Sequence, residues 1–208
     1  MSNSIPQALV EFNEDVVLDL VEQRLAADDS PIVLVTELQE GMRLVGERFS
    51  NGLYFLSELI MSADLFTQAM KKIEPYIVGQ SIQHHGSIVI GTPKGDIHDL
   101  GKNIFCTVAR GSGFEVHDLG VDVPSERFVE AVEDLKPQIL GFSALLTTTF
   151  DEMKKVVDEL TVRGLRDRLK VIIGGGVTTE TVRRHIGADF QTIDAVEGLE
   201  KCKAFLKG

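Results

Sequence analysis

The spacing of apolar residues changes once along the 208-residue chain, between residues 74 and 87. Before the change the spacing is helical, as in Val35, Leu38, Met42, Val45 and Phe49, which follow one another at steps of three and four. After the change, short apolar runs alternate with helical stretches. The first part therefore predicts a small antiparallel bundle of three or four helices, and the second part predicts an α/β domain.

The helical part divides at residues that commonly begin or end helices. One helix is expected to run through Leu9 and Leu25, a second begins at Ser30-Pro31 and stops near Gly52, and a third ends before Pro75. The polar stretch that follows is typical of a linker. We therefore expect a helical bundle over residues 1–78, a linker over 79–86 and an α/β domain over 87–208.

The second part contains five candidate strands, at residues 87–90, 115–119, 138–142, 170–173 and 190–193. Helices fit at about 100–111, 125–135, 150–163, 178–186 and 196–207. The runs 88–90 and 171–173 are apolar without alternation, as expected for strands that are covered on both faces. Five βα units predict a doubly wound, flavodoxin-like (Rossmann-like) parallel sheet with strand order 2-1-3-4-5.

Composition excludes several classes of partner. The chain has 21 Lys and Arg against 32 Asp and Glu, a net charge of −11, which disfavours nucleic acid and anionic lipid surfaces. No apolar stretch approaches the roughly 18 residues of a membrane span, and the N-terminus lacks the pattern of a signal peptide, so we expect a cytoplasmic protein. Cys106 and Cys202 predict neither a disulfide nor a CxxC site.

The loop after the first strand, residues 91–103, carries two acids and a histidine between glycines. It matches neither GxGxxG nor the Walker spacing. Asp96 and His98 lie two apart, so in extended backbone the carboxylate can bind one imidazole nitrogen and leave the other for a metal. The alternative is a loop histidine that caps the following helix.

Two other loops at strand ends are unusual. Residues 141–149 are small and hydroxylated, which suits a ligand but also the N-cap of a helix near Phe150. Gly174, Gly175 and Gly176 follow the fourth strand. A tight turn needs one glycine, whereas three suggest a bulky, flat or deeply inserted ligand.

In the predicted sheet, strands 1, 3 and 4 are neighbours, so one ligand could contact all three loops. Apart from His98, these loops offer no cluster of His, Cys or carboxylates able to complete a metal site. A single protein ligand suffices only if the metal arrives already chelated in a macrocycle. The residues alone do not identify the macrocycle.

The same residues carry a family resemblance. Asp96, His98 and Gly101, followed by Ser143 with Leu145 and then by Gly174-Gly175, resemble the cobalamin-binding signature DxHxxG…SxL…GG. The helical bundle before them resembles the cap domain of methionine synthase and of the small corrinoid proteins of methanogens and acetogens. The resemblance covers residues from about 10 to 208 and implies a corrinoid-binding protein.

Roles follow from the resemblance. It implies that His98 replaces dimethylbenzimidazole as the lower ligand of cobalt, that Asp96 hydrogen-bonds His98, and that Thr149 completes a proton relay as cobalt cycles between cobalt(I) and methyl-cobalt(III). It implies further cofactor contacts at Gly95, Ile97, Asp99, Gly101, Ser143, Leu145, Thr147, Gly174, Gly175 and Gly176. In the cap, Tyr54, Phe55 and Met61 are candidates for the upper face of the corrin, with plain bundle core as the alternative.

The function implied by the resemblance is that of a methyl carrier, methylcobalamin being the loaded form. A substrate:corrinoid methyltransferase would supply the methyl group from a methoxylated aromatic or a methylamine. A second methyltransferase would pass it to tetrahydrofolate or a thiol, and a reductive activation protein would restore the cobalt. The chain would be one subunit of a multi-component system rather than a complete enzyme. The alternatives are a cobalamin-sensing regulator, disfavoured by the charge, and the small subunit of an adenosylcobalamin mutase, disfavoured by the bundle.

Overall fold

The computed structural model describes residues 4–77 and 85–207, which form two compact units. One unit contains the helices that precede residue 78, and the other contains the five-stranded sheet. Most of the expected linker, 79–86, lies outside the described residues, so the domain boundaries stay a prediction.

The helical unit contains α1 (Ile5–Val10), α2 (Glu14–Ala26), α3 (Pro31–Ser50) and α4 (Leu56–Ile73), followed by a 3₁₀ turn, η1 (Glu74–Tyr76). The expectation of one helix through Leu9 and Leu25 was wrong, because the chain breaks between α1 and α2. Phe12 has a φ of +57°, which no α-helix accommodates, and the Asn13 side chain accepts a hydrogen bond from Val16 N to start α2.

The helices of this unit pack as α1 against α3, α3 against α4, and α2 against α4. Their contacts bury Leu9, Leu38 and Leu59 almost completely. α3 begins with Ser30 before Pro31, as expected, since proline at the first helical position lacks only an amide hydrogen that the helix would not use. The apolar spacing read from the sequence thus corresponds to the buried side of the bundle.

The sheet contains β1 (Ser87–Gly91), β2 (Glu115–Asp118), β3 (Ile139–Ser143), β4 (Lys170–Gly174) and β5 (Phe190–Thr192). All neighbouring strands are parallel, in the order β2-β1-β3-β4-β5, so the predicted topology is confirmed. Because the strands are parallel, the loops that follow them all leave from one edge of the sheet.

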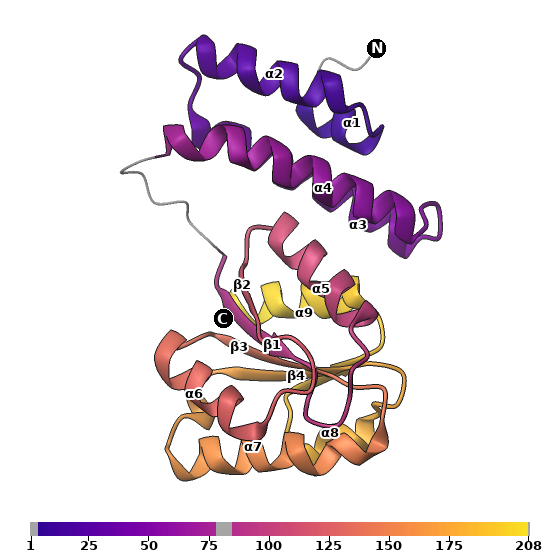
Figure 1. The fold of residues 1–208 in the computed structure, drawn as a ribbon, viewed down its shortest axis with the longest axis vertical. Coiled ribbons are helices and arrows are strands. Elements are labelled where there is room, and N and C mark those ends of the chain that lie inside the picture. Colours follow the sequence, from indigo (N-terminus) through magenta and orange to yellow (C-terminus); the bar gives the residue numbers. More distant parts are fainter. Residues whose placement is uncertain (1–3, 78–84, 208) are drawn as a thin grey trace. The chain divides into compact units, whose positions relative to one another are not determined.

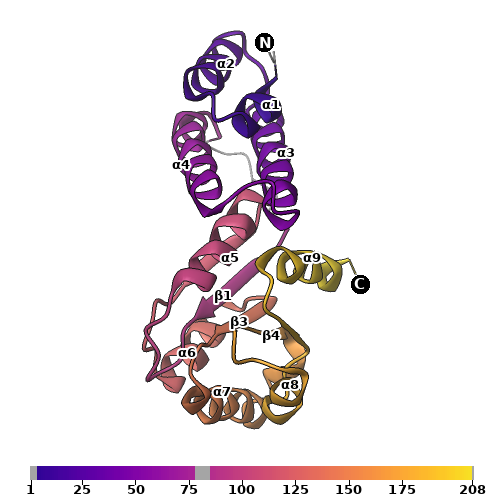
Figure 2. The same cartoon turned by 90° about the vertical axis from the view of Figure 1, so that its right-hand side faces the viewer.

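Helices cover both faces of the sheet (Figures 1 and 2). α5 (Leu100–Gly111) and α9 (Ala195–Leu206) lie on one face, and α6 (Ser125–Leu135), α7 (Phe150–Val162) and α8 (Glu180–Ile186) lie on the other. On the second face the Phe128 and Phe142 rings meet edge to face with centroids 4.9 Å apart, beside the buried Met153 and Leu160. No described helix is long and apolar enough to cross a membrane.

Candidate functional site

Asp96 and His98 contact each other in the loop after β1. Asp96 Oδ1 lies 2.7 Å from His98 Nδ1 and also accepts a hydrogen bond from His98 N at 2.9 Å. The Asp96 side chain is fully buried, whereas the His98 side chain is 52% exposed. With Nδ1 held by the carboxylate, Nε2 is the ring nitrogen that this contact does not use, an arrangement common among metal-binding histidines.

The other oxygen of Asp96 ties this loop to the loop after β3. Asp96 Oδ2 accepts hydrogen bonds from Leu145 N at 2.7 Å and from Leu146 N at 3.1 Å. Burial of the carboxylate raises its pKa, but the hydrogen bonds from His98, Leu145 and Leu146 outweigh burial and hold the pKa of Asp96 below its ordinary value. Asp96 is therefore ionised at neutral pH.

Thr149, which the resemblance places in a relay with Asp96, is fully buried in the 3₁₀ turn η2 (Thr147–Thr149). Its hydroxyl donates to the carbonyl oxygen of Leu146 at 2.8 Å. The same Leu146 donates its backbone N–H to Asp96. In this structure Thr149 is thus connected to the Asp96 carboxylate through the backbone of Leu146.

The glycines after β4 do not all need a ligand to explain them. Gly175 has a φ of +110°, and a Cβ built on it would lie 2.0 Å from the carbonyl oxygen of Ala144. Ala144 N also donates to Gly174 O at 2.9 Å. Ser143 pairs with Gly174 in the β3–β4 register. The close approach of the two backbones therefore accounts for Gly175 without any bound molecule.

Glycines around His98 have the opposite environment. A Cβ built on Gly95 or on Gly101 would meet no protein atom within 4 Å. Gly101 lies in the first turn of α5, and Asp99 supports that turn by accepting from Asn103 Nδ2 at 3.0 Å. No packing against other parts of the protein therefore requires a glycine at position 95 or 101.

Large apolar side chains are exposed in the loops at the carboxyl edge of the sheet. Ile97 and Ile193 are 73% and 75% exposed. We call the whole set the apolar rim: Ile97, Leu100, Val121, Leu145, Leu146 and Ile193. Exposed apolar side chains at the sheet edge that also carries His98 fit a broad, largely apolar macrocycle with a central metal. The residues present thus fit the corrin that the resemblance implies.

The three candidates from the helical unit differ in how they are held. Tyr54 is half-buried, its hydroxyl donates to Val10 O at 2.7 Å, and Arg48 donates to that hydroxyl at 2.6 Å. Phe55 and Met61 are 73% and 55% exposed. Tyr54 thus holds the bundle together, whereas Phe55 and Met61 are available to contact a ligand.

Sequence reasoning missed three residues that support the His98 loop. Lys102, only 3% exposed, forms an ion pair with Asp118 at the end of β2. Asp122 accepts a hydrogen bond from Gly95 N at 2.8 Å. The motif contains neither of these two contacts, because each joins the β1 loop or the start of α5 to the end of β2 or to the loop after it. Asp118 and Asp122 could have been found from their position at or just after the end of β2, whereas Lys102 in α5 carried no such signal.

We also searched the described residues for metal-binding groups and for hollows. Among these residues, no group of three or more His, Cys, Asp or Glu residues could hold a metal ion.

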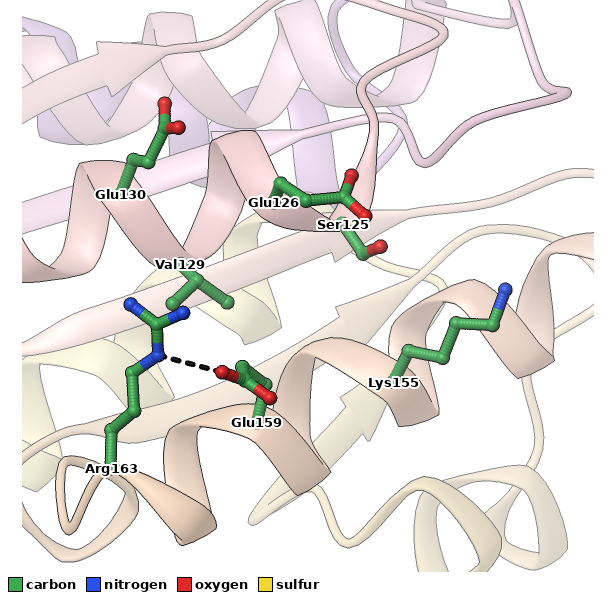
Figure 3. A pocket seen from close by; sticks show the side chains of 7 residues that line it. All are labelled: Ser125, Glu126, Val129, Glu130, Lys155, Glu159 and Arg163. Atoms are coloured by element: carbon green, nitrogen blue, oxygen red, sulfur yellow. Dashed lines mark hydrogen bonds and ion pairs between the residues drawn. The ribbon is translucent and has the colours of Figure 1, made fainter.

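A hollow of about 480 Å³ lies between α6 and α7, lined by charged side chains that include Lys155, Glu159 and Arg163 (Figure 3). Arg163 pairs there with Glu159 and also with Glu133, which lies outside the lining.

Comparisons with known proteins identify the family of the chain. A family model described as a B12 binding domain matches residues 86–201, and a second model with the same description matches residues 2–74. A dimethylamine corrinoid protein from Methanosarcina barkeri is 38% identical over 205 residues, which cover 97% of this chain and 95% of that protein.

Similar chains among the solved structures point to the same family. A novel cobalamin-binding protein from Desulfitobacterium hafniense is 40% identical with a TM-score of 0.79, covering 98% of this chain and 97% of that one. A chain of the methanol:cobalamin methyltransferase complex from Methanosarcina barkeri is 31% identical with a TM-score of 0.90, covering 98% of this chain and 78% of that one. The chain therefore belongs to the family of B12-binding corrinoid proteins, and its cofactor is a cobalamin.

Proposed function

We propose that this corrinoid protein is the methyl carrier of a methyltransferase system and that His98 Nε2 binds the cobalt of its cofactor. When bound, the corrinoid supplies a cobalt that takes up a methyl group and gives it to an acceptor. The observation that carries the proposal is the 2.7 Å contact between the buried Asp96 carboxylate and Nδ1 of the half-exposed His98.

Asp96 acts in this proposal as a positioning residue. Its carboxylate accepts from four N–H groups, two on His98 and two in the loop after β3, so the imidazole is held in one orientation. A carboxylate on Nδ1 selects the tautomer with Nε2 free and makes that nitrogen a stronger ligand. The lowered pKa of Asp96 keeps the carboxylate charged at neutral pH.

Other side chains complete the proposed cofactor site. The apolar rim would lie against the corrin, and Gly95 and Gly101 would let it approach the loop. Ser143 and Leu145, with Gly174 and Gly175, would line the slot for the displaced nucleotide tail, as the resemblance implies, and Thr147 and Gly176 would be further cofactor contacts. Phe55 and Met61 stay candidates for the upper face, because both are exposed.

We propose a methylated amine as the methyl donor. Support comes from the dimethylamine corrinoid protein that shares 38% of its residues with this chain along nearly its whole length. The partners would be a substrate:corrinoid methyltransferase, a second methyltransferase that uses tetrahydrofolate or a thiol, and a reductive activator. The similar chain from the methanol:cobalamin methyltransferase complex supports a partner of the first kind.

The ligand assignment is tested by reconstituting the protein with cobalamin and recording its absorption spectrum. The wild type should show the base-off, histidine-ligated spectrum, and His98→Ala should lose it and regain it in the presence of imidazole. His185→Ala is the matched control, because His185 is an exposed histidine of α8. An unchanged spectrum in His98→Ala would refute the assignment.

The donor is tested by supplying the reduced, reconstituted protein with one methyltransferase and its substrate at a time. Dimethylamine, trimethylamine, methanol and a methoxylated aromatic are compared, and methylation is followed by the change in absorption. We expect methylation with an amine-specific methyltransferase. Methylation only with methanol or with the methoxylated aromatic would overturn the choice of amine and leave the carrier role intact.

A further inference from the structure

The loop after β2, residues 119–124, runs beside the His98 loop beyond the ends of their strands. Thr92 N donates to Gly120 O at 3.0 Å, Val123 N donates to Thr92 O at 3.0 Å, and Lys94 N donates to Val123 O at 2.8 Å. Pro93 and Val123 form an isolated parallel bridge. The parallel pairing of β1 and β2 thus continues into the loop that leads to His98.

Asp122 makes two hydrogen bonds to the segment that precedes the ligand. Its backbone N–H donates to Asp96 O at 2.9 Å, and its Oδ1 accepts from Gly95 N at 2.8 Å. One residue therefore binds the amide at the start of the Gly95–Asp96 pair and the carbonyl at its end. This arrangement fixes the backbone from which the Asp96 carboxylate reaches His98.

The backbone of Asp122 is itself unusual. Its φ of +53° lies in the left-handed region, which aspartate tolerates better than most residues with a side chain. Gly95, its partner, has a φ of +89°. Both residues of this hydrogen bond thus adopt backbone conformations of turns and not of extended strands.

We infer that Asp122 is a positioning residue for the proposed cobalt ligand, acting through Gly95 and Asp96 on the orientation of His98. The inference rests on the proposed function, because it needs His98 to bind cobalt. Asp96 is held from two sides: its carboxylate by Leu145 and Leu146, and its backbone by Asp122. Replacing the Asp122 side chain removes the hydrogen bond to Gly95 N, while the backbone N–H of residue 122 still donates to Asp96 O and Asp96 N still donates to Pro93 O. The segment that leads to His98 then has one restraint fewer.

Three variants separate the hydrogen bond from the backbone conformation. Asp122→Gly keeps the positive φ but removes the side-chain oxygen that accepts from Gly95 N. Asp122→Asn keeps the positive φ and an acceptor oxygen. Asp122→Ala removes the acceptor oxygen and also disfavours the positive φ. Asp28→Gly is the matched control, because Asp28 is another aspartate with positive φ, at +64°, in the helical unit.

The first measurement uses the full chain reconstituted with cobalamin. Mutation of a residue that hydrogen-bonds a metal-ligating histidine typically lowers metal affinity 10- to 100-fold. Asp122 contacts Gly95 and Asp96 instead of His98 itself, so we expect a smaller effect: Asp122→Gly should weaken cobalamin binding about three- to tenfold. The histidine-ligated fraction of the spectrum should fall in parallel. Asp122→Asn and Asp28→Gly should stay within about twofold of the wild type.

The second measurement uses the protein without cofactor, so that a general loss of stability is recognised. Asp122→Gly should speed hydrogen exchange at the Gly95 amide while the amides of β3 keep their protection. Binding and ligated fraction within twofold of the wild type, or an unchanged Gly95 exchange rate, would overturn the inference. A wild-type spectrum that does not depend on His98 would instead refute the ligand assignment, and this inference with it.

Discussion

The loops after β1 and after β4 leave the same edge of the sheet, and both are rich in glycine, yet their glycines have different surroundings. After β4, a Cβ on Gly175 would lie 2.0 Å from a backbone oxygen of the neighbouring loop. After β1, a Cβ on Gly95 or Gly101 would meet no protein atom within 4 Å. The number of glycines in a loop therefore does not reveal a ligand site. A glycine whose neighbouring space the protein fills is explained without a ligand, whereas open space beside a glycine leaves room for a ligand or for solvent.

The largest effect expected is on the β4 side, from Gly175→Ala. The new Cβ must displace the Ala144 carbonyl at a φ of +110°, so we expect a loss of about 3–5 kcal/mol in the free energy of unfolding. Urea denaturation measures it. Gly174→Ala is the control, since its Cβ would lie 3.3 Å from Thr192 O, and it should lose about 1 kcal/mol. Equal losses in the two variants would contradict the comparison.

Asp96→Asn tests the β1 side. Asparagine has one acceptor oxygen, so its amide group would face either the Leu145 and Leu146 amides or the two donors on His98. In a fully buried position we expect a loss of about 2–3 kcal/mol. Asp194→Asn, at the exposed N-cap of α9, is the control and should change stability by less than about 0.5 kcal/mol. A loss no larger at position 96 than at 194 would show that the buried carboxylate is not needed.

The stability difference between the wild type and Asp96→Asn should depend on pH. The pKa of Asp96 is lowered on folding, so its charge stabilises the fold above the ordinary value of about 4, and this contribution disappears as the pH falls through the folded value. The difference in unfolding free energy between wild type and Asp96→Asn should therefore be constant from pH 7 to 5 and shrink below pH 4. A difference that stays constant down to pH 3 would mean that folding does not lower the pKa of Asp96.

The smallest effect, with opposite signs on stability and binding, is expected from Gly101→Ala. Alanine favours the helix, so the apo protein should gain about 0.5–1 kcal/mol. If the open space beside Gly101 belongs to the corrin, cobalamin affinity should fall about fivefold, which is about 1 kcal/mol. Calorimetric titration and urea denaturation of the same sample measure both. An unchanged affinity would mean that the corrin does not approach this glycine.

Periodicity predicted most of the α/β unit correctly, because each βα unit repeats a local pattern. The helices at 100–111 and 125–135 begin and end where their apolar spacing does. The break at Phe12 was missed, because Phe12 keeps the helical spacing while its backbone turns to a positive φ. A side-chain pattern does not report a backbone angle that packing elsewhere imposes.

The sequence by itself determined the sheet order, the pairing of Asp96 with His98 and the family, since all three depend on local spacing or on a motif. Only the tertiary structure decided that Gly175 serves the approach of two backbones, that Thr149 connects to Asp96 through Leu146, and that Asp122 holds Gly95. These contacts join loops that lie 27 to 50 residues apart in the chain. Their partners are brought together by the parallel sheet, and no short stretch of sequence records which loops will meet at its edge.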